Sequence, residues 1–511
     1  MNSFTQFYEH SKPQRLAARV MLLLTALFLC VSNQIVLLPD LPNWYDQQRF
    51  LALLVLAVGL FFYALRPLYP TSPWATGLML GAVILSLISP LPGWAFAESA
   101  LFMGLVILAA WINSALRPIQ MQRPKLILYC LIIYTMLISL PPLMQYLLAI
   151  NHHQEFHLAS LFRGFSNHRF FSQVESVLIP LAALPAITLS EASHWRRLGN
   201  VAACLLWLLA FAAGTRAFYV AIMSSMIFAL FAPDQTGKVW CRWQIRFALI
   251  GWSGYVLLFM LAPKLLSFSI SSDNARLNTL EGGLNSSGRL EMWIASFMLI
   301  LEHPLTGIGP MHFATLTQSA STQGFAAHPH NVIIQLLVEW GLPFGIAAIA
   351  TITTFTVRFW QKLVQNSTTR TKSTEISVIA ISLITALIYS LFDGTVVTPY
   401  TQILLALFIG LTWSLSKEEF KTRQEVHRNF IVRLNTFLTR ILCMMSGVFL
   451  IWLATTPLNA LTPHVENYAT SQRGQALWPR FWSQGLINLP IDDRYLLPGW
   501  FVDESPLKKT P

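Results

Sequence analysis

Apolar residues in this chain are gathered in long blocks, separated by short polar segments, and this pattern sets the expected architecture. Most blocks approach the roughly 20 residues that an α-helix needs to cross a bilayer core of about 30 Å. We distinguish thirteen blocks, of which the second and the eighth are short. They cover residues 16–38, 50–65, 74–91, 94–112, 125–150, 170–190, 197–213, 217–232, 245–263, 331–357, 375–392, 398–416 and 431–455. The pattern predicts an all-α polytopic integral membrane protein with about 12–14 transmembrane helices.

The composition of the chain agrees with this expectation. Of the 511 residues, 54% are hydrophobic and only 11% are charged, whereas about a quarter of the residues of a soluble domain are charged. The first block is long and has no small-residue cleavage site after it, unlike a secretory signal peptide. We therefore expect it to remain as a membrane anchor.

Positively charged residues between the blocks indicate the orientation. Lys12, Arg15 and Arg19 precede the first block, which places the N-terminus in the cytoplasm because positive loops stay inside. Alternating from there, most of the 34 Lys and Arg residues fall in cytoplasmic loops. The net charge of +11 therefore reflects orientation and attraction to anionic membrane lipids, and it requires no nucleic acid partner.

This orientation divides the chain into five regions. They are a cytoplasmic N-terminus (1–15), transmembrane helices 1–9 (16–263), an outer loop (264–330), transmembrane helices 10–13 (331–455) and an outer C-terminal tail (456–511). Residues 151–169 are also expected outside, and the three outer segments hold nine of the twelve histidines. None of the five cysteines lies in an outer loop, so no disulfide is expected there.

The 264–330 loop is the longest outer segment, and a loop of this length is more often functional than a simple connector. Its stretch "LEMWIASFMLILEHP" is apolar but too short to span, so we expect it at the membrane interface or packed on the bundle. In "LTGIGPMHF", Gly307, Gly309 and Pro310 predict an irregular turn.

Two arginines stand at predicted helix starts on the outer side. Arg216 lies in "AAGTRAFYV", where one helix ends at Gly214 and the next begins at once, and Arg289 begins the apolar stretch of the long loop. Two arginines near a helix N-terminus would make a good anion site. The alternatives are a snorkelling interfacial anchor for Arg216 and a solvated loop residue for Arg289.

The sequence "HPHN" closes the long loop and leaves three interpretations open. Asn331 is a suitable N-cap for the helix that follows, and His330 could simply be a polar residue at a helix start. His328 and His330 supply two metal ligands at most, so we expect no metal site. The third interpretation is general acid–base chemistry by His330, because only histidine has an unperturbed pKa near neutrality.

Further polar groups lie near these positions. Glu175 and Glu339 fall inside predicted transmembrane helices, where carboxylates usually face a bundle interior or a cavity. Glu339 could equally serve as a structural partner for a buried arginine or a backbone donor. Polar residues also stand next to the outer helix ends, namely Arg163, Asn167, His168 and Asp393.

Three motifs occur in one order along the outer side: "AAGTR", "SSGRLEMWIASFMLILEHPLTGIGPMHF" and "HPHNVIIQLLVEWGLPFG". With them, over residues about 160–410, the chain resembles the superfamily of bacterial O-antigen ligases, Wzy-type O-antigen polymerases and protein O-oligosaccharyltransferases. Each motif alone is weak, and their order gives the resemblance its specificity. The resemblance implies a GT-C-like glycosyltransferase architecture in the bacterial inner membrane, with 264–330 as a periplasmic catalytic loop.

The resemblance also implies a reaction. The enzyme would be a metal-independent glycosyltransferase without cofactors, using an undecaprenyl-diphosphate-linked glycan as donor. Carried over by motif, Arg216 and Arg289 would bind the diphosphate and stabilise the departing charge. His330 would orient or deprotonate the acceptor hydroxyl for inverting attack on the sugar. Other residues are expected to support substrate binding, namely Arg163, Asn167, His168, His328, Asn331, Glu339 and Asp393.

The acceptor is less constrained than the donor. We favour lipid A-core, as in a ligase, over a protein hydroxyl or a growing polysaccharide, because the tail is shorter than the C-terminal region typical of protein-modifying members. A transporter or flippase of lipid-linked sugars is the alternative of another class. Transporters usually carry charged groups near the membrane midplane, whereas the suggestive residues here cluster at the outer helix ends.

Overall fold

The computed structural model describes most of the chain. The described residues are 12–39, 41, 43–68, 72–122, 124–152, 154–231, 235–271, 289–314, 327–365, 370–415, 430–455 and 481. The first half contains α1 (Lys12–Val31), α2 (Trp44–Leu65), α3 (Pro73–Leu87), α4 (Pro92–Gln122), α5 (Pro124–Asn151), β1 (Phe156–His157), η1 (Leu158–Phe162), α6 (His168–Leu181), α7 (Leu184–Thr188), α8 (His194–Ala213), α9 (Arg216–Leu230) and α10 (Thr236–Tyr255). The second half contains η2 (Val256–Leu261), α11 (Ala262–Leu265), β2 (Ile270–Ser271), α12 (Arg289–Glu302), α14 (Val332–Gln365), α15 (Arg370–Tyr389), α16 (Pro399–Leu415) and α18 (Phe430–Thr455).

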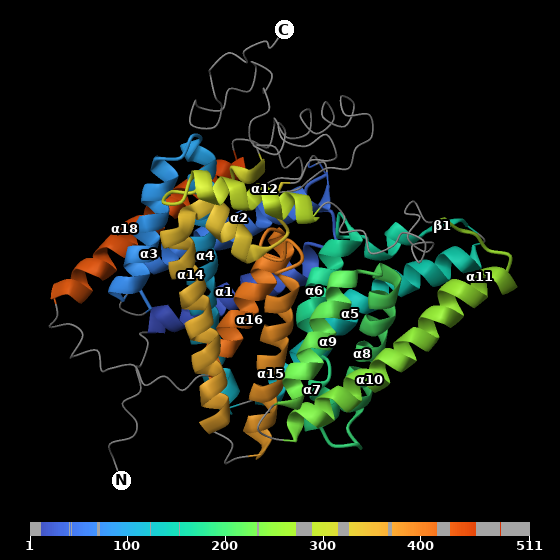
Figure 1. Ribbon diagram of the computed structural model, residues 1–511. Helices are drawn as coiled ribbons and strands as arrows, with labels where there is room; N and C mark the ends of the chain where they lie inside the picture. Colours follow the sequence, from blue (N-terminus) through green and yellow to red (C-terminus); the bar gives the residue numbers. More distant parts are fainter. Residues whose placement is uncertain are drawn as a thin grey trace, which may run out of the picture.

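The predicted all-α membrane architecture is confirmed. Within the described residues, nine helices are long and apolar enough to cross a membrane, and four shorter apolar helices accompany them. Each of the thirteen helical spans coincides with one of the thirteen predicted blocks. Most run in the same general direction in Figure 1, whereas α12 lies across their upper end.

The first predicted block, 16–38, is longer than the helix that forms, because α1 ends at Val31. The side chain of Gln47 explains the early end. Its amide nitrogen donates to the carbonyls of Ser32 at 3.1 Å and Ile35 at 2.9 Å. These contacts satisfy backbone groups that a longer helix would have bonded internally.

Two further blocks differ in their bounds. Block 170–190 is divided into α6 and α7, because Pro185 has no amide hydrogen with which to continue the helical hydrogen bonds. Block 245–263 is the latter part of a longer run that begins at Thr236 and passes through the π-helical turn η2. Because the start of that run contains polar residues, the hydrophobic pattern did not predict its first turns.

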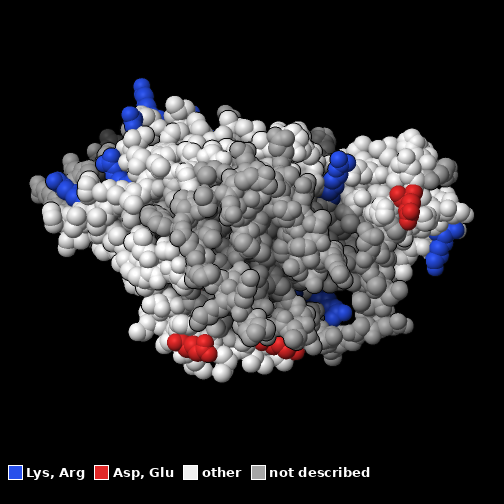
Figure 2. Space-filling view, turned by 90° about the horizontal axis from the view of Figure 1, so that it is seen from above, with Lys and Arg blue, Asp and Glu red and all other residues white. Residues whose placement is uncertain are grey.

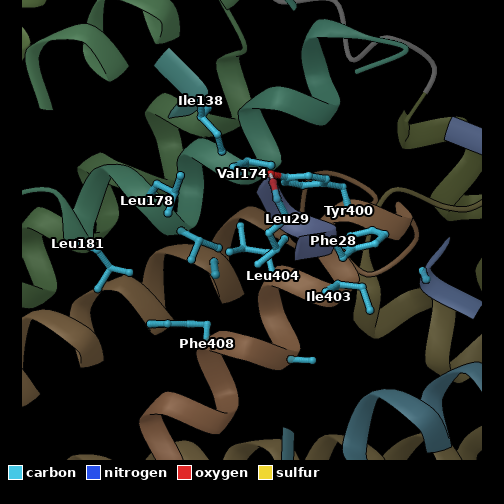
Figure 3. Packing of buried hydrophobic residues seen from close by; sticks show 14 of the residues in the cluster. Phe28, Leu29, Ile138, Val174, Leu178, Leu181, Tyr400, Ile403, Leu404 and Phe408 are labelled. Atoms are coloured by element: carbon cyan, nitrogen blue, oxygen red, sulfur yellow. Dashed lines mark hydrogen bonds between the residues drawn. The ribbon is translucent and has the colours of Figure 1, made fainter. Parts of the chain in front are cut away.

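Figure 3 shows the part of the bundle core where α1, α6 and α16 meet. Phe28 and Leu29 of α1 pack with Tyr400 and Leu404 of α16, beside Val174 of α6. The Tyr400 hydroxyl donates to the Leu29 carbonyl at 2.6 Å. An internal partner of this kind is needed because the lipid core offers no water to a buried hydroxyl.

The three predicted outer segments share one end of the molecule. Strand β1, from segment 151–169, pairs in parallel with β2 of the long loop. The Phe481 carbonyl of the tail accepts from Arg49, which also donates to the carbonyl of Val397 between α15 and α16. The opposite end joins the starts of α10 and α15, where Thr236 and Thr374 lie 3.4 Å apart. The alternation of outer and cytoplasmic segments predicted from charge therefore agrees with the two ends of the bundle. The compartment that each end faces stays a prediction.

Helix α14 is broken near its start, and the long loop fills the break. Gly341 has φ +76°, a left-handed conformation inside an otherwise helical run. The amides of Ile308 and Gly309 donate to the Val338 and Glu339 carbonyls at 2.9 and 3.1 Å. A methyl group on Gly307 would lie 2.5 Å from the Glu339 backbone, so only glycine fits there. The irregular turn predicted at Gly307 and Gly309 thus supplies the backbone partners that the kinked helix lacks.

Candidate functional site

His330 occupies a constrained turn at the start of α14. Its φ is +52°, a left-handed conformation uncommon for a side chain other than glycine. Its backbone amide donates to Nδ1 of His328 at 3.2 Å, and the two rings are 4.2 Å apart. Asn331 caps the helix as predicted, accepting from the amides of Ile333 and Ile334 at 2.9 and 3.1 Å. The turn therefore holds His330 at a fixed place in front of the helix.

Asp393 faces His330 from the loop between α15 and α16. His330 Nδ1 lies 3.4 Å from Asp393 Oδ1, and Asp393 is only 4% exposed. The same carboxylate accepts from the Tyr389 hydroxyl at 2.9 Å and from the Gly394 amide at 2.7 Å. The Val332 amide donates to the Ser390 carbonyl at 3.0 Å, so the two loops are also joined through their backbones.

These contacts assign the protons of the pair. Burial opposes ionisation of Asp393, but its hydrogen bond and charge interaction with His330, the Gly394 amide and the charge of Arg169 together lower the pKa of this carboxyl below its ordinary value. An ionised carboxylate only accepts hydrogen bonds. Nδ1 of His330 must then carry the proton it shares with Asp393, which leaves Nε2 as the nitrogen that can take one up.

Helix α12 brings Arg289 to this pair. The Trp293 indole nitrogen donates to the Pro329 carbonyl, between the two histidines, at 2.9 Å. Arg289 lies four residues earlier and therefore on the same face of α12. Burial lowers the pKa of Arg289, the nearby Asp393 raises it, and the neighbouring Arg169 lowers it further. A guanidinium remains protonated in proteins, so Arg289 contributes a partly buried positive charge beside Asp393.

Helix α6 contributes a second charge, Arg169, in its first turn. Arg169 influences both Asp393 and Arg289 electrostatically. One turn further, the Ser172 hydroxyl donates to the Thr215 hydroxyl at 2.9 Å. Thr215 is the N-cap residue of α9, directly before Arg216, whose side chain is exposed. The tight turn predicted after Gly214 is confirmed, and it places Arg216 next to the helix that carries Arg169.

Positive side chains are scattered on the described part of this face. Figure 2 views this end of the molecule from above and shows scattered Lys and Arg side chains on its described part, without a continuous basic patch. The arginines that approach Asp393 come from the starts of separate helices, which meet at this end in Figure 1. Such an arrangement suits a small anion better than a long polyanion.

Other predicted site residues have structural contacts. The Asn167 side chain accepts from the Arg169 amide at 2.9 Å and caps α6. Arg163 is exposed at the end of η1, and His168 lies near the Phe162 ring. A Glu339 carboxylate oxygen accepts from the Phe313 amide at 3.2 Å, which matches the alternative of a backbone partner. Their predicted roles in substrate binding stay predictions.

The charged side chains offer little to a metal ion. Among the described residues, no group of three or more His, Cys, Asp or Glu side chains could hold one. Glu175 is fully buried, and both its carboxylate oxygens lack a hydrogen-bond partner in the described part of the chain. A single carboxylate does not make up a metal ligand set.

Three residues of this site were not singled out from the sequence. Arg169 lies in the stretch "FRGFSNHRFF", of which Arg163, Asn167 and His168 were selected because they stand next to the helix start. Trp293 lies in the apolar stretch of α12, where an indole looks like a packing residue. Tyr389 lies four residues before Asp393, and this spacing on one helix face was the available signal.

Comparison with known families assigns the central part of the chain. A family profile described as O-antigen ligase matches residues 201–350, a segment that contains Arg216, Arg289 and His330. Comparison with curated proteins gives no match. The family supports an O-antigen ligase- or polymerase-like function and a glycosyltransferase-like enzyme in general terms. The predicted resemblance is therefore confirmed: over residues 201–350 this multi-pass membrane protein is similar to the O-antigen ligase family.

Proposed function

We propose that the protein transfers a glycan from an undecaprenyl-diphosphate carrier to an acceptor hydroxyl, at the end of the bundle where His330 lies. The observation that carries the proposal is the His330–Asp393 pair, at 3.4 Å, with the charges of Arg289 and Arg169 beside it. His330 with Asp393 is suited to act as a general base, and Arg289 with Arg169 is suited to bind an anion. A glycan linked to a lipid diphosphate carries such an anion at the membrane surface, and the glycan is already activated for transfer.

The arginines act on the leaving group. Guanidinium groups match phosphate oxygens with two parallel hydrogen bonds. Arg289 and Arg169 are held at the starts of α12 and α6, and Arg216 at the start of α9. Together they bind the diphosphate of the donor. They stabilise the reaction mainly as negative charge develops on the diphosphate while the sugar–phosphate bond breaks.

His330 acts on the acceptor. Its Nε2 takes the proton of the acceptor hydroxyl while the oxygen bonds to the anomeric carbon, and undecaprenyl diphosphate leaves from the opposite side with inversion. Asp393 accepts a hydrogen bond from the protonated Nδ1, fixes the tautomer and stabilises the imidazolium that forms, a role known for carboxylates behind catalytic histidines. Tyr389 and the Gly394 amide hold the carboxylate in this orientation.

The acceptor we favour is lipid A-core on the periplasmic face of the inner membrane, with the N-terminus in the cytoplasm. Reporter fusions test the orientation. A fusion after Arg246 should read cytoplasmic, and one near Ser286, which lies outside the described residues, should read periplasmic. The reverse pattern would place His330 in the wrong compartment and would remove the proposal.

Glycan transfer by the purified protein tests the reaction itself. The assay contains a lipid-diphosphate-linked glycan, no nucleotide and a chelator, with lipid A-core, a Ser/Thr-rich protein and a second lipid-linked glycan as separate acceptors. We expect transfer to lipid A-core. Transfer only to one of the other acceptors would keep the chemistry and change the acceptor. Movement of the donor across a vesicle membrane without any transfer would favour a transporter.

A further inference from the structure

A buried arginine outside the proposed reaction links the site to the C-terminal tail. Arg49 lies near the start of α2 and is 1% exposed. Its Nε donates to the Phe481 carbonyl at 2.7 Å, and its Nη1 donates to the Gln402 side-chain oxygen at 2.6 Å. Its Nη2 donates to the Val397 carbonyl at 2.7 Å and to the Tyr45 hydroxyl at 3.3 Å. One planar group therefore fixes positions on α2, α16, the tail and the loop between α15 and α16.

The loop that Arg49 holds is the loop that carries Asp393. The Val397 carbonyl accepts from Arg49, while the Val397 amide donates back to the Gly394 carbonyl at 2.9 Å. Gly394 in turn donates its amide to Asp393 at 2.7 Å. Gln402 holds the same loop through a bond from its amide nitrogen to the Val396 carbonyl at 2.6 Å. A shift at Val397 is thus passed through one turn to the carboxylate that faces His330.

Phe481 completes the surroundings of Arg49. Its side chain is 2% exposed, and the Arg49 guanidinium carbon stands 5.0 Å from the centre of its ring. The ring also meets Trp94 of α4 edge-on at 6.0 Å. A buried guanidinium needs most of its donors satisfied. If the Phe481 carbonyl moves away, the arginine must reorient, and its bond to Val397 changes with it.

We propose that Arg49 is a positioning residue that couples the packing of Phe481 to the position of the Asp393 loop. The tail is therefore required for an active site. The proposal rests on the function proposed above, and it adds a role for a tail residue that lies more than a hundred residues beyond the family match. Arg49 touches no reacting atom in this scheme and acts through Val397, Gly394 and Asp393.

A double-mutant cycle separates this role from a general effect on folding. Arg49→Lys should lower turnover about tenfold when Asp393 is present and less than about twofold in the Asp393→Asn background, because contacts in one network are not additive. Donor binding should stay unchanged in both. Arg440→Lys is the matched control, since Arg440 also donates to a backbone carbonyl of α2, that of Ala64 at 2.6 Å, near the other end of the helix. Equal losses from Arg49→Lys in both backgrounds would overturn the proposal.

Hydrogen exchange gives a test that needs no transferase activity. Phe481→Ala leaves Arg49 in place and removes only the ring through which the tail packs against Arg49 and Trp94. It should raise amide exchange of the peptide covering residues 390–398 and leave the peptide covering 303–314 unchanged. Phe449→Ala is the control, because the Phe449 ring also meets an aromatic partner edge-on, Phe96 at 4.8 Å. Unchanged exchange at 390–398 would overturn the coupling, whereas absent transfer by the native protein would overturn only the proposed function.

Discussion

Arginines at the two ends of this bundle have very different surroundings. At one end, Arg196 and Arg246 contact a single ring, with their guanidinium carbons 5.5 and 5.0 Å from the centre of Trp243. The acidic partner of Arg196 is Glu191, whose side chain is 92% exposed. At the other end, Arg289 is partly buried and Asp393, at its side, is almost fully buried.

The difference lies in the acidic partner, because Arg196 is itself partly buried, like Arg289. An ion pair with a well-solvated partner contributes about 0–1 kcal/mol to stability, so the pair of Arg196 with Glu191 adds little. Charges gathered around a buried carboxylate interact more strongly, because less water screens them. Charged residues counted along the sequence cannot distinguish the two cases. The predictions that follow test the distinction, beginning with the largest expected effect.

The strongest contrast is between two neighbouring histidines. His330→Ala should lower turnover by roughly 10²–10⁴-fold, the range for loss of a general base, while the donor still binds. His328→Ala should cost less, because His328 shapes the turn through its bond from the His330 amide. Transfer and donor binding are measured on the purified variants. Loss of donor binding in His330→Ala would instead move this residue to the diphosphate side of the site.

Arg289→Lys and Arg196→Lys compare the two ends directly. Lysine keeps the charge but loses the planar fork that matches phosphate oxygens. Arg289→Lys should lower turnover about 100-fold, similar to the loss of one donor to a developing anion, and Arg216→Lys should also impair transfer. Arg196→Lys should leave turnover unchanged. Equal activity of all three variants would mean that the arginines at both ends are anchors.

Gly394→Ala should disturb the site through packing. A methyl group there would lie 2.5 Å from Cε1 and 2.6 Å from Nε2 of His328, so the ring must move away from the His330 turn. We expect a loss of about 1–3 kcal/mol of stability, as for other overpacked positions, together with lower turnover. Gly77→Ala is the control, because its methyl group would meet nothing within 4 Å. An unchanged thermal midpoint for Gly394→Ala would show that the turn accommodates the methyl group without loss of stability.

The smallest effect concerns pH. Because the pKa of Asp393 is depressed in the folded protein, its contribution to stability is present above the unfolded value of about 3.9 and is lost only as the pH falls towards the lower folded value. The stability difference between the native protein and Asp393→Asn should therefore not decrease as the pH falls from about 8 to 5, because Asp393 stays ionised over this range. Thermal unfolding across this range measures it. A difference that shrinks between pH 7 and 5 would show that Asp393 titrates near its ordinary pKa.

Much of the fold could be predicted because the bilayer restricts it. Blocks of apolar residues predicted the thirteen apolar helices of the described residues, and the alternating charge of the segments between them grouped the outer segments at one end. The break in α14 at Gly341 was not predicted, since "EWGLPFG" is apolar throughout and the hydrophobic pattern continues across it. Backbone groups of Pro304, Ile308 and Gly309, some thirty residues earlier, form hydrogen bonds with the broken segment and stabilise it.

The site could be predicted in part. His330, Arg289 and Asp393 were selected because they stand at helix ends on one side, and the structure brings them together. Arg169 was passed over although it stands two residues after Asn167, since a sequence does not show which residue of a helix's first turn faces inward. Arg49 gave no signal either. Its neutral partners, the carbonyls of Val397 and Phe481, belong to backbone whose position depends on the whole bundle.

The contacts of Arg49 also bear on the order in which the protein is made. A chain emerges from its N-terminus, so α2 is in place long before the Asp393 loop is synthesised. The acceptors for this arginine lie 348 and 432 residues further along. During most of synthesis its guanidinium must rely on water or on temporary partners. Under the proposed coupling, the contacts of Arg49 can therefore be complete only after Phe481 has been synthesised.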